Sequence, residues 1–264
     1  MEPRDARGYH PVRTLMQTVA LCDRIDIRPA RQYRLTIPQM YGDPERNLIT
    51  RAYRLGREIA GDLPVVSIAC VKNIPAGAGL GGGSADAAAV LRWVQACAPL
   101  CDAASHAHQL GMDVPFLVRG GTAAAEGYGE QLQFLAPLPP WPVLLASPGF
   151  GVPTDQAYRA FDQLPPELEN MPGLDQLARE MRGGHVPPDL FNGLERAAWA
   201  VRPALRAFKE TLERSTGLSW FLSGSGSVYF SLNRDREILA AARRVLRRQG
   251  IPWTEVTHFV PSVD

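Results

Sequence analysis

The chain has 264 residues, of which 45% are hydrophobic and 21% charged, and its formal net charge is +1. This composition is typical of a folded globular protein, and the length suffices for one large domain or two small ones. The near-zero charge argues against a nucleic-acid partner, and the polar N-terminus argues against a signal peptide. The lack of an 18-residue apolar run argues against a membrane span, so we expect a cytoplasmic protein.

The cysteines and histidines indicate no metal site. None of the four cysteines stands at zinc-finger spacing, which predicts free thiols at Cys22, Cys70, Cys97 and Cys101. His106 and His108 have poor neighbouring ligands, and we expect them at the surface.

The first part of the chain predicts two strands and a helix. Residues 8–30 form a loop followed by a strand, and residues 31–37 form a second strand. Apolar side chains recur at helical spacing over residues 47–60. Asn47 then stands where an ordinary helix N-cap is expected.

A glycine-rich stretch follows, at residues 75–86, between a predicted strand at 65–71 and an alanine-rich helix at 85–98. Its five glycines within seven residues leave the backbone N–H groups open to a bulky anionic group. Ser84 is the predicted N-cap of the helix and Asp86 falls in its predicted first turn. Glycines followed by the positive end of a helix predict a site for phosphate groups.

Other interpretations of this stretch exist. A plain flexible turn is one, and a dinucleotide-binding turn is another, because Gly77, Gly79 and Gly82 satisfy the G-x-G-x-x-G pattern. Five residues separate the strand from the first of these glycines, whereas the dinucleotide motif requires a direct turn. The Gly-Lys-Ser/Thr of a P-loop is missing.

A carboxylate then follows a helix stop. Residues 102–110 predict a helix that ends at Gly111, and Asp113 precedes a Val-Pro-Phe run that we expect to be a strand. A turn residue would also fit here. Transfer of a phosphoryl group to an alcohol needs a base or an orienting group on the hydroxyl, and Asp113 could supply it.

The second half begins after a proline-rich segment at residues 135–142, which predicts a domain boundary near residue 140. Thr154 is a predicted helix cap, and residues 165–188 are expected to be a loosely helical, mobile surface segment. The other predicted elements are a strand at 143–147, helices at 155–161 and 236–249, one or two helices over 192–213, a strand–turn–strand unit at 218–232, and a strand at 251–259.

At this point the motifs resemble a known family. Pro-x-Gly-x-Gly-Leu-Gly-Gly-Gly-Ser-x-Asp-Ala-Ala is similar to the ATP-phosphate loop of the GHMP kinase superfamily, and the resemblance is greatest to its branch acting on a cytidine diphosphate-linked methylerythritol. The matching segments, in the family's order, are 8–10, 45–49, 75–88, 111–116, 152–154 and 222–227.

The resemblance implies an α+β fold with two domains and an active site in the cleft between them. Residues 1–140 would form the N-terminal domain, which is ribosomal S5 domain 2-like, and residues 141–264 a ferredoxin-like C-terminal domain. The implied reaction transfers a phosphoryl group from ATP, with Mg²⁺, to the 2-hydroxyl of the small-molecule acceptor, in non-mevalonate isoprenoid synthesis.

The resemblance also implies roles for residues. Asp113 would be the catalytic acid/base, and Ser84 would approach the phosphate–magnesium group. The implied ATP-binding residues are Asn47, Lys72, Pro75, Gly77, Gly79, Leu80, Gly81, Gly82, Gly83 and Ser84. The implied contacts to the cytidine-bearing acceptor come from Tyr9, His10, Thr154 and Tyr158. Each of these roles has an alternative. Lys72 could simply be a solvated residue at a strand end, and Tyr9 and His10 could belong to an ordinary surface loop.

One family feature is missing. The family has an Ala-Pro-Ala-Lys-Ile-Asn-Leu strand before its Gly-Tyr-His loop, and its Lys lies beside the catalytic Asp; only seven residues precede Gly8 here. We expect either a strand encoded upstream of a misassigned start or a catalytically weak nucleotide-binding homologue with an unpaired sheet edge. Another small-alcohol kinase of the superfamily, of homoserine or mevalonate type, is a further alternative that the Gly-Tyr-His segment argues against.

Overall fold

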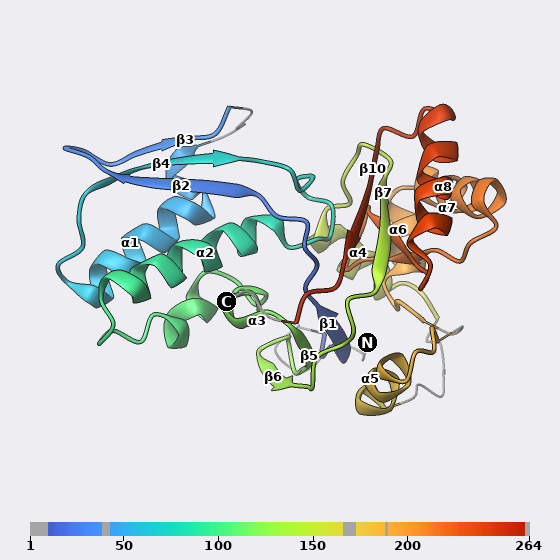
Figure 1. The fold of residues 1–264 in the computed structure, drawn as a ribbon, viewed down its shortest axis with the longest axis horizontal. Helices are drawn as coiled ribbons and strands as arrows, with labels where there is room; N and C mark the ends of the chain where they lie inside the picture. The colour runs from blue at the N-terminus through green and yellow to red at the C-terminus, as the bar shows by residue number, and fades with distance from the viewer. Residues whose placement is uncertain (1–9, 39–42, 166–172, 188–189, 262–264) are drawn as a thin grey trace. The chain divides into compact units, whose positions relative to one another are not determined.

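The computed structural model describes residues 10–38, 43–165, 173–187 and 190–261 (Figure 1). Contacts divide the chain into two compact units. Among the described residues, the larger unit contains residues 10–20, Ala76–Leu80 and the chain from residue 121 to 261, and the smaller one contains Leu21–Pro75 and Gly81–Gly120. Each unit is defined by contacts and is made of several separate segments of the chain. The division into domains 1–140 and 141–264 therefore stays a prediction.

The smaller unit is built on a three-stranded sheet. The strand order is β2 (Arg24–Pro29), β4 (Val66–Val71), β3 (Arg34–Thr36). β2 runs antiparallel and β3 parallel to β4. Two helices, α1 (Leu48–Ala60) and α2 (Gly82–Cys97), cover one face of this sheet (Figure 1) and bury their apolar side chains with those of the strands. The predicted strands and helices of this region are therefore confirmed, with small shifts of their ends.

Gly56 lies where α1 and α2 pack together. A Cβ atom at this position would stand 2.3 Å from Cγ2 of Val94 on α2, and Val94 is fully buried. Only a residue without a side chain therefore fits here.

Three short helices complete the smaller unit: the 3₁₀ helices η1 (Pro44–Arg46) and η2 (Ala104–Gln109), and α3 (Val114–Arg119). The predicted helix at 102–110 is thus a 3₁₀ helix. The prediction of a strand after Asp113 was wrong, because these residues form α3. Pro115 lies in the first turn of α3, where the missing N–H breaks no hydrogen bond.

The larger unit contains a four-stranded antiparallel sheet. Its order is β10 (Trp253–His258), β7 (Pro142–Ser147), β9 (Tyr229–Leu232), β8 (Phe221–Leu222). Between β7 and β8 the chain forms α4 (Thr154–Phe161), α5 (Leu174–Arg182), α6 (Glu195–Val201) and α7 (Ala204–Thr216), and between β9 and β10 it forms α8 (Arg236–Arg248). In chain order the strands lie fourth, first, third and second, which is the ferredoxin-like arrangement that the sequence predicted.

The larger unit also holds a second sheet of three antiparallel strands. Its order is β1 (Thr14–Gln17), β5 (Thr122–Glu126), β6 (Gln131–Phe134). A turn at residues 127–130 connects β5 to β6. β5 is the central strand of this sheet, and all of its residues but the last are buried.

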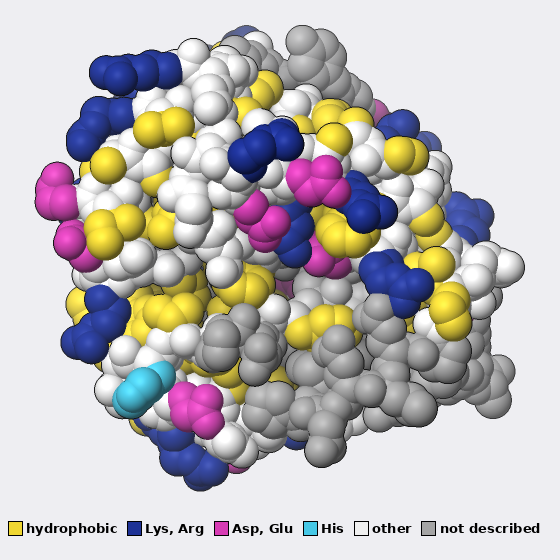
Figure 2. Space-filling view, turned by 90° about the vertical axis from the view of Figure 1, so that its right-hand side faces the viewer, with side chains coloured by type: hydrophobic (Ala, Val, Ile, Leu, Met, Phe, Trp, Pro, Cys, Tyr) yellow, Lys and Arg dark blue, Asp and Glu magenta, His cyan; other side chains and the backbone are white. Residues whose placement is uncertain are grey.

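The surface shows no large cluster of one charge on the face drawn in Figure 2, where basic, acidic and apolar side chains are interspersed. Arg243, in the arginine-rich helix α8, donates to Glu255 and to the Thr254 carbonyl. All four cysteines are free thiols, and the described residues include no cluster of three potential metal ligands. No described helix has the length and apolarity to span a membrane; the cytoplasmic location stays a prediction.

Candidate active site

The glycine-rich segment leads into α2 without a side-chain cap. Gly81 is the N-cap and has φ 65°, a left-handed backbone that glycine adopts without strain. α2 therefore begins at Gly82, and the predictions that Ser84 caps the helix and that Asp86 lies in its first turn were wrong. Ser84 is in the first turn, and Asp86 lies one residue beyond it. The N–H groups of Gly82, Gly83 and Ser84 have no acceptor within the helix and mark its positive end.

The first part of the segment, from Ala76 to Leu80, packs on the turn between β8 and β9. The Ala78 carbonyl accepts from the Val228 N–H at 3.0 Å, and the Gly79 carbonyl accepts from the Ser223 hydroxyl at 2.9 Å. A Cβ at Gly79 would stand 2.2 Å from the Ser223 carbonyl oxygen, so the contact requires glycine. Pro75 and Leu80 are half-buried, and Gly77 is exposed.

Asn192 braces the same turn and was missed by the sequence reasoning. Its side-chain amide donates to the carbonyls of Leu222 and Gly224, at 2.8 Å each. Nothing in the spacing of Asn192, thirty residues earlier, signals this contact. The β8–β9 turn therefore binds Gly79, and Asn192 in turn stabilises the β8–β9 turn.

Asp113 occupies the N-cap position of α3 but does not cap it. Its carboxylate makes no capping hydrogen bond. Its Oδ2 atom instead lies 4.0 Å from the place of a Cβ on Gly81, at the start of α2. Desolvation by the surrounding atoms raises the pKa of Asp113, and water moderates this effect because the residue is still exposed. The structure thus brings the predicted catalytic acid beside the predicted phosphate-binding helix end.

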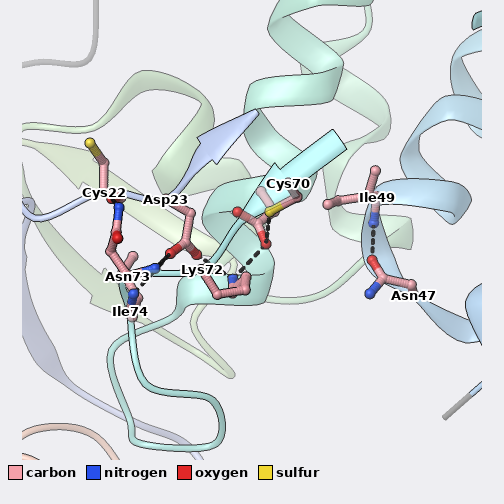
Figure 3. A network of polar contacts seen from close by, with 9 residues as sticks. Cys22, Asp23, Asn47, Ile49, Cys70, Lys72, Asn73 and Ile74 are labelled. Atoms are coloured by element: carbon pink, nitrogen blue, oxygen red, sulfur yellow. Dashed lines mark hydrogen bonds and ion pairs between the residues drawn. The ribbon is translucent and has the colours of Figure 1, made fainter. Parts of the chain in front are cut away.

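Lys72 lies between two carboxylates at the end of β4 (Figure 3). Its Nζ donates to Asp23 Oδ2 and, at 2.7 Å, to Asp86 Oδ2. Desolvation lowers the pKa of Lys72, but the bonds to Asp23 and Asp86 outweigh it, and the pKa is raised overall. Desolvation raises the pKa of Asp86 to about 6, although Lys72 opposes this shift.

Asp23 was not singled out from the sequence. β2 and β4 are antiparallel and pair Arg24 with Val71, so the residues just beyond this pair, Asp23 and Lys72, come side by side. The feature that identifies Asp23 is therefore its position opposite Lys72 across the two strands, and it can be recognised only when the register of β2 and β4 is known.

Asn47 caps α1, as its ordinary interpretation predicted. Its side-chain oxygen accepts from the Ile49 N–H at 2.9 Å (Figure 3). A role for Asn47 beside adenine stays a prediction.

His10 and Tyr158 lie together in the larger unit, whereas Tyr9 is outside the described residues. The His10 side chain is 3% exposed, and its Nε2 lies 2.9 Å from Asp162 Oδ1. The ring centroids of His10 and Tyr158 are 5.5 Å apart, and Phe161 meets His10 edge-on at 5.3 Å. His10 is therefore held by an acid and two aromatic rings.

Thr154 is the first residue of α4 and not its cap, because Pro153 occupies the N-cap position. The prediction of a Thr154 cap was wrong for this reason. The Thr154 hydroxyl instead lies 2.9 Å from the hydroxyl of Ser225 in the β8–β9 turn. Thr154 thus contributes to the polar side of that turn.

Comparisons with known proteins agree with these features. The family model described as GHMP kinases N terminal domain matches residues 47–121. The chain is 40% identical to a 4-diphosphocytidyl-2-C-methyl-D-erythritol kinase of Thermus thermophilus, covering 93% of this chain and 87% of that protein. It is 36% identical to a protein of the same name from Pelotomaculum thermopropionicum, covering 91% and 86%.

Solved structures give the same result. The fold matches a crystal structure of 4-(cytidine 5'-diphospho)-2C-methyl-D-erythritol kinase with a TM-score of 0.83 and 35% identity, over 98% of this chain and 93% of that one. A homoserine kinase from Cytophaga hutchinsonii matches with a TM-score of 0.65 at 18% identity, over 94% of this chain and 89% of that one, and so shares the fold alone.

Proposed function

The chain belongs to the 4-diphosphocytidyl-2-C-methyl-D-erythritol kinase family of the GHMP kinases, and from this membership we propose that it transfers the γ-phosphoryl group of ATP to the 2-hydroxyl of 4-diphosphocytidyl-2-C-methyl-D-erythritol. This reaction belongs to the non-mevalonate isoprenoid pathway. One observation supports the proposal most. The Asp113 carboxylate makes no capping hydrogen bond and lies beside Gly81, the glycine that precedes helix α2.

The phosphates of ATP are proposed to bind at the N-terminus of α2. The N–H groups of Gly82, Gly83 and Ser84 point out of the helix end, and the glycines leave room for a large anion. The partial positive charge of a helix end adds about 0.3–1 kcal/mol for an anion, and more where water is excluded. The neighbouring glycines 77, 79 and 81 all have positive φ, so side chains would strain this backbone.

Magnesium fits the residues present. Mg²⁺ keeps several waters and takes one or two protein oxygens together with substrate phosphates, so it needs no protein cage of its own. The hydroxyl of Ser84, in the first turn of α2, would contact an ion carried by the triphosphate. When bound, such an ion would neutralise charge that develops on the phosphate oxygens.

Asp113 is proposed to orient the acceptor hydroxyl and to take its proton as phosphoryl transfer proceeds. In the described part of the chain its carboxylate accepts no hydrogen bond and forms no ion pair, which leaves both oxygens for a substrate. Its raised pKa brings it nearer to neutral pH, and a base in that range accepts a proton more effectively.

The cytosine of the acceptor is proposed to bind at His10 and Tyr158. A buried histidine held by Asp162 offers a fixed polar edge, and Tyr158 offers an aromatic face. Thr154 would add a hydroxyl contact. These residues would provide specificity for a cytidine-bearing substrate, while the glycine-rich segment binds ATP.

The test is ATP consumption with a panel of acceptors. We expect turnover with the cytidine-bearing methylerythritol and none with homoserine or mevalonate. Turnover with either of the latter, and not with the former, would contradict the substrate assignment. His10→Ala should raise the KM for the cytidine-bearing acceptor tenfold or more and leave the KM for ATP unchanged.

A second variant tests the base. Asp113→Asn removes the proton acceptor and keeps the side-chain volume, so kcat should fall at least a hundredfold while ATP binding persists. Near-normal kcat in this variant would remove Asp113 from the mechanism.

A further inference from the structure

We propose that Asp23, Lys72 and Asp86 are positioning residues that fix the glycine-rich segment to the start of α2, and that Lys72 serves this purpose without contacting the triphosphate. The inference rests on the proposed function, because it concerns the segment that would bind ATP. It adds Asp23 and Asp86, to which neither the motifs nor the comparisons assign a role.

Asp23 holds the entry of the segment through its backbone. Its Oδ1 accepts from the N–H of Asn73 at 2.5 Å and from the N–H of Ile74 at 2.8 Å (Figure 3). The Asn73 side chain donates in turn to the Cys22 carbonyl at 2.9 Å. The Asp23 side chain is only 2% exposed, and a buried carboxylate is stable there only if such donors satisfy it.

The same carboxylate lies under the first residue of α2. A Cβ on Gly82 would stand 3.7 Å from Asp23 Oδ2 and 2.9 Å from Cγ2 of Ile74. Asp23 therefore binds the chain where it enters the glycine-rich segment and lies close to the first residue of α2, where Gly82 leaves the space free.

Lys72 connects this point to the body of the helix. Its Nζ binds Asp23 Oδ2 and Asp86 Oδ2, and the Asp86 side chain is 7% exposed. Asp86 is on α2, one turn beyond its start. The chain of contacts thus runs from the Asn73 and Ile74 amides through Asp23 and Lys72 to Asp86.

Charge argues against a direct role of Lys72 on phosphate. One ammonium and two carboxylates carry a net negative charge, which repels a triphosphate. Both carboxylates are nearly buried, and the ammonium directs hydrogens to each of them. The arrangement is therefore better suited to holding backbone in place than to attracting an anion.

The two roles predict opposite effects of removing Asp23. If Lys72 bound the phosphates, Asp23→Asn would free its charge and tighten ATP binding, while Lys72→Met would weaken it. If the three residues position the backbone, both variants weaken ATP binding, because each breaks the same chain of contacts. The sign of the Asp23→Asn effect therefore distinguishes them.

The experiment measures the Kd for ATP by calorimetry, and amide hydrogen exchange over residues 72–84 without nucleotide, in wild type, Asp23→Asn and Lys72→Met. Lys209→Met is the matched control, because Lys209 pairs with Glu195 at 3.0 Å with both side chains 19% exposed, in α7 and α6 of the larger unit. It breaks a comparable half-buried ion pair that includes none of Asp23, Lys72 and Asp86.

We expect a roughly tenfold higher Kd for ATP and at least tenfold faster exchange over residues 72–84 in both variants. Lys209→Met should leave both within twofold of wild type. An unchanged or lower Kd in Asp23→Asn, or unchanged exchange in either variant, would overturn the proposal. Should Asp23→Asn fail to fold, amide exchange over residues 72–84 in Lys72→Met decides, because a lysine that only contacts phosphate would leave this exchange unchanged without nucleotide.

The exchange measurement needs no nucleotide and so does not depend on the proposed function. If wild type fails to phosphorylate the acceptor but residues 72–84 exchange faster in Asp23→Asn, the proposed function fails and the positioning role stands. If wild type is active and both variants bind ATP and exchange as wild type does, the positioning role alone fails.

Discussion

The environment of single carboxylates determines what each can do in this protein. Asp113 stands at a helix N-cap, where an acid usually accepts from the helix backbone, and yet it makes no such bond. Asp23 is in the opposite condition, because it accepts hydrogen bonds from the Lys72 ammonium and from the N–H groups of Asn73 and Ile74. A carboxylate without internal donors can accept a proton from a substrate, and one with many cannot.

The raised pKa of Asp113 predicts the acid limb of the pH profile. A base acts only when ionised, so kcat/KM should fall as pH drops through the pKa of Asp113. Surrounding atoms that displace water raise this pKa, and the fall should therefore begin at a higher pH than for a free aspartate, whose pKa is about 3.9. The measurement is kcat/KM for the acceptor from pH 4 to 8 at saturating ATP, with circular dichroism to confirm folding.

Asp86 needs a control in this profile, because burial raises its pKa to about 6. We therefore expect kcat/KM of the Asp86→Asn variant, measured at saturating ATP, still to fall at low pH if Asp113 causes the fall. A limb that disappears in that variant, or one centred at or below the pKa of a free aspartate, would contradict the assignment to Asp113.

At the scale of elements, the approach of α1 to α2 sets the position of the helix that carries the predicted phosphate site. Gly56 makes this approach possible, since Val94 fills the space that a side chain would need. In an exposed helix, replacing glycine by alanine stabilises by about 1 kcal/mol. Here the added methyl would overlap a fully buried valine, and overpacking costs about 1–3 kcal/mol.

We therefore expect Gly56→Ala to lower the free energy of unfolding by about 1–2 kcal/mol, because the overlap outweighs the gain in helix propensity. Urea denaturation followed by circular dichroism measures the change. Glu58→Ala, on the exposed face of the same helix, is the control and should change stability by less than about 0.5 kcal/mol. A Gly56→Ala variant as stable as wild type would show that the two helices separate readily.

Most elements could be predicted from the sequence because their apolar residues recur with a clear period. The errors lie where local chemistry is ambiguous. Val-Pro-Phe after Asp113 is a short apolar run that suits a strand or a helix start, and contacts elsewhere in the fold decide for the helix. The predicted start of α2 is three residues late, because Ser84 is a good cap by type but Gly81 takes the left-handed backbone more easily.

At the scale of the whole molecule, contacts between distant parts of the chain were beyond the sequence. The Ser223 hydroxyl binds the Gly79 carbonyl across 144 residues, and Asp23 reaches Asn73 and Ile74 across about fifty. The register of β2 on β4 brings Asp23 to Asn73 and Ile74, whereas the packing of the glycine-rich segment on the β8–β9 turn brings Ser223 to Gly79. The motifs therefore predicted which residues matter in the glycine-rich segment but not which residues hold it.

Ligand binding should stabilise the folded chain as a whole. ATP that binds the native state alone adds RT ln(1 + [L]/Kd) to the free energy of unfolding, which is about 2.7 kcal/mol at a hundred times the Kd. For a chain of this size, in which 1 kcal/mol shifts Tm by about 2–4 °C, that corresponds to a rise in Tm of about 5–10 °C. Differential scanning fluorimetry with MgATP measures it.

The control ligand is a nicotinamide dinucleotide, the ligand of the alternative interpretation of Gly77, Gly79 and Gly82. Because the glycine-rich segment is joined to β4 through Asn73 and Ile74 and not by a direct turn, this ligand should leave Tm unchanged at the same concentration. Asp113→Asn should keep the full shift with MgATP, since Asp113 is proposed to act on the acceptor, whereas Asp23→Asn should reduce it. A shift with the dinucleotide and none with MgATP would reverse the assignment of the site.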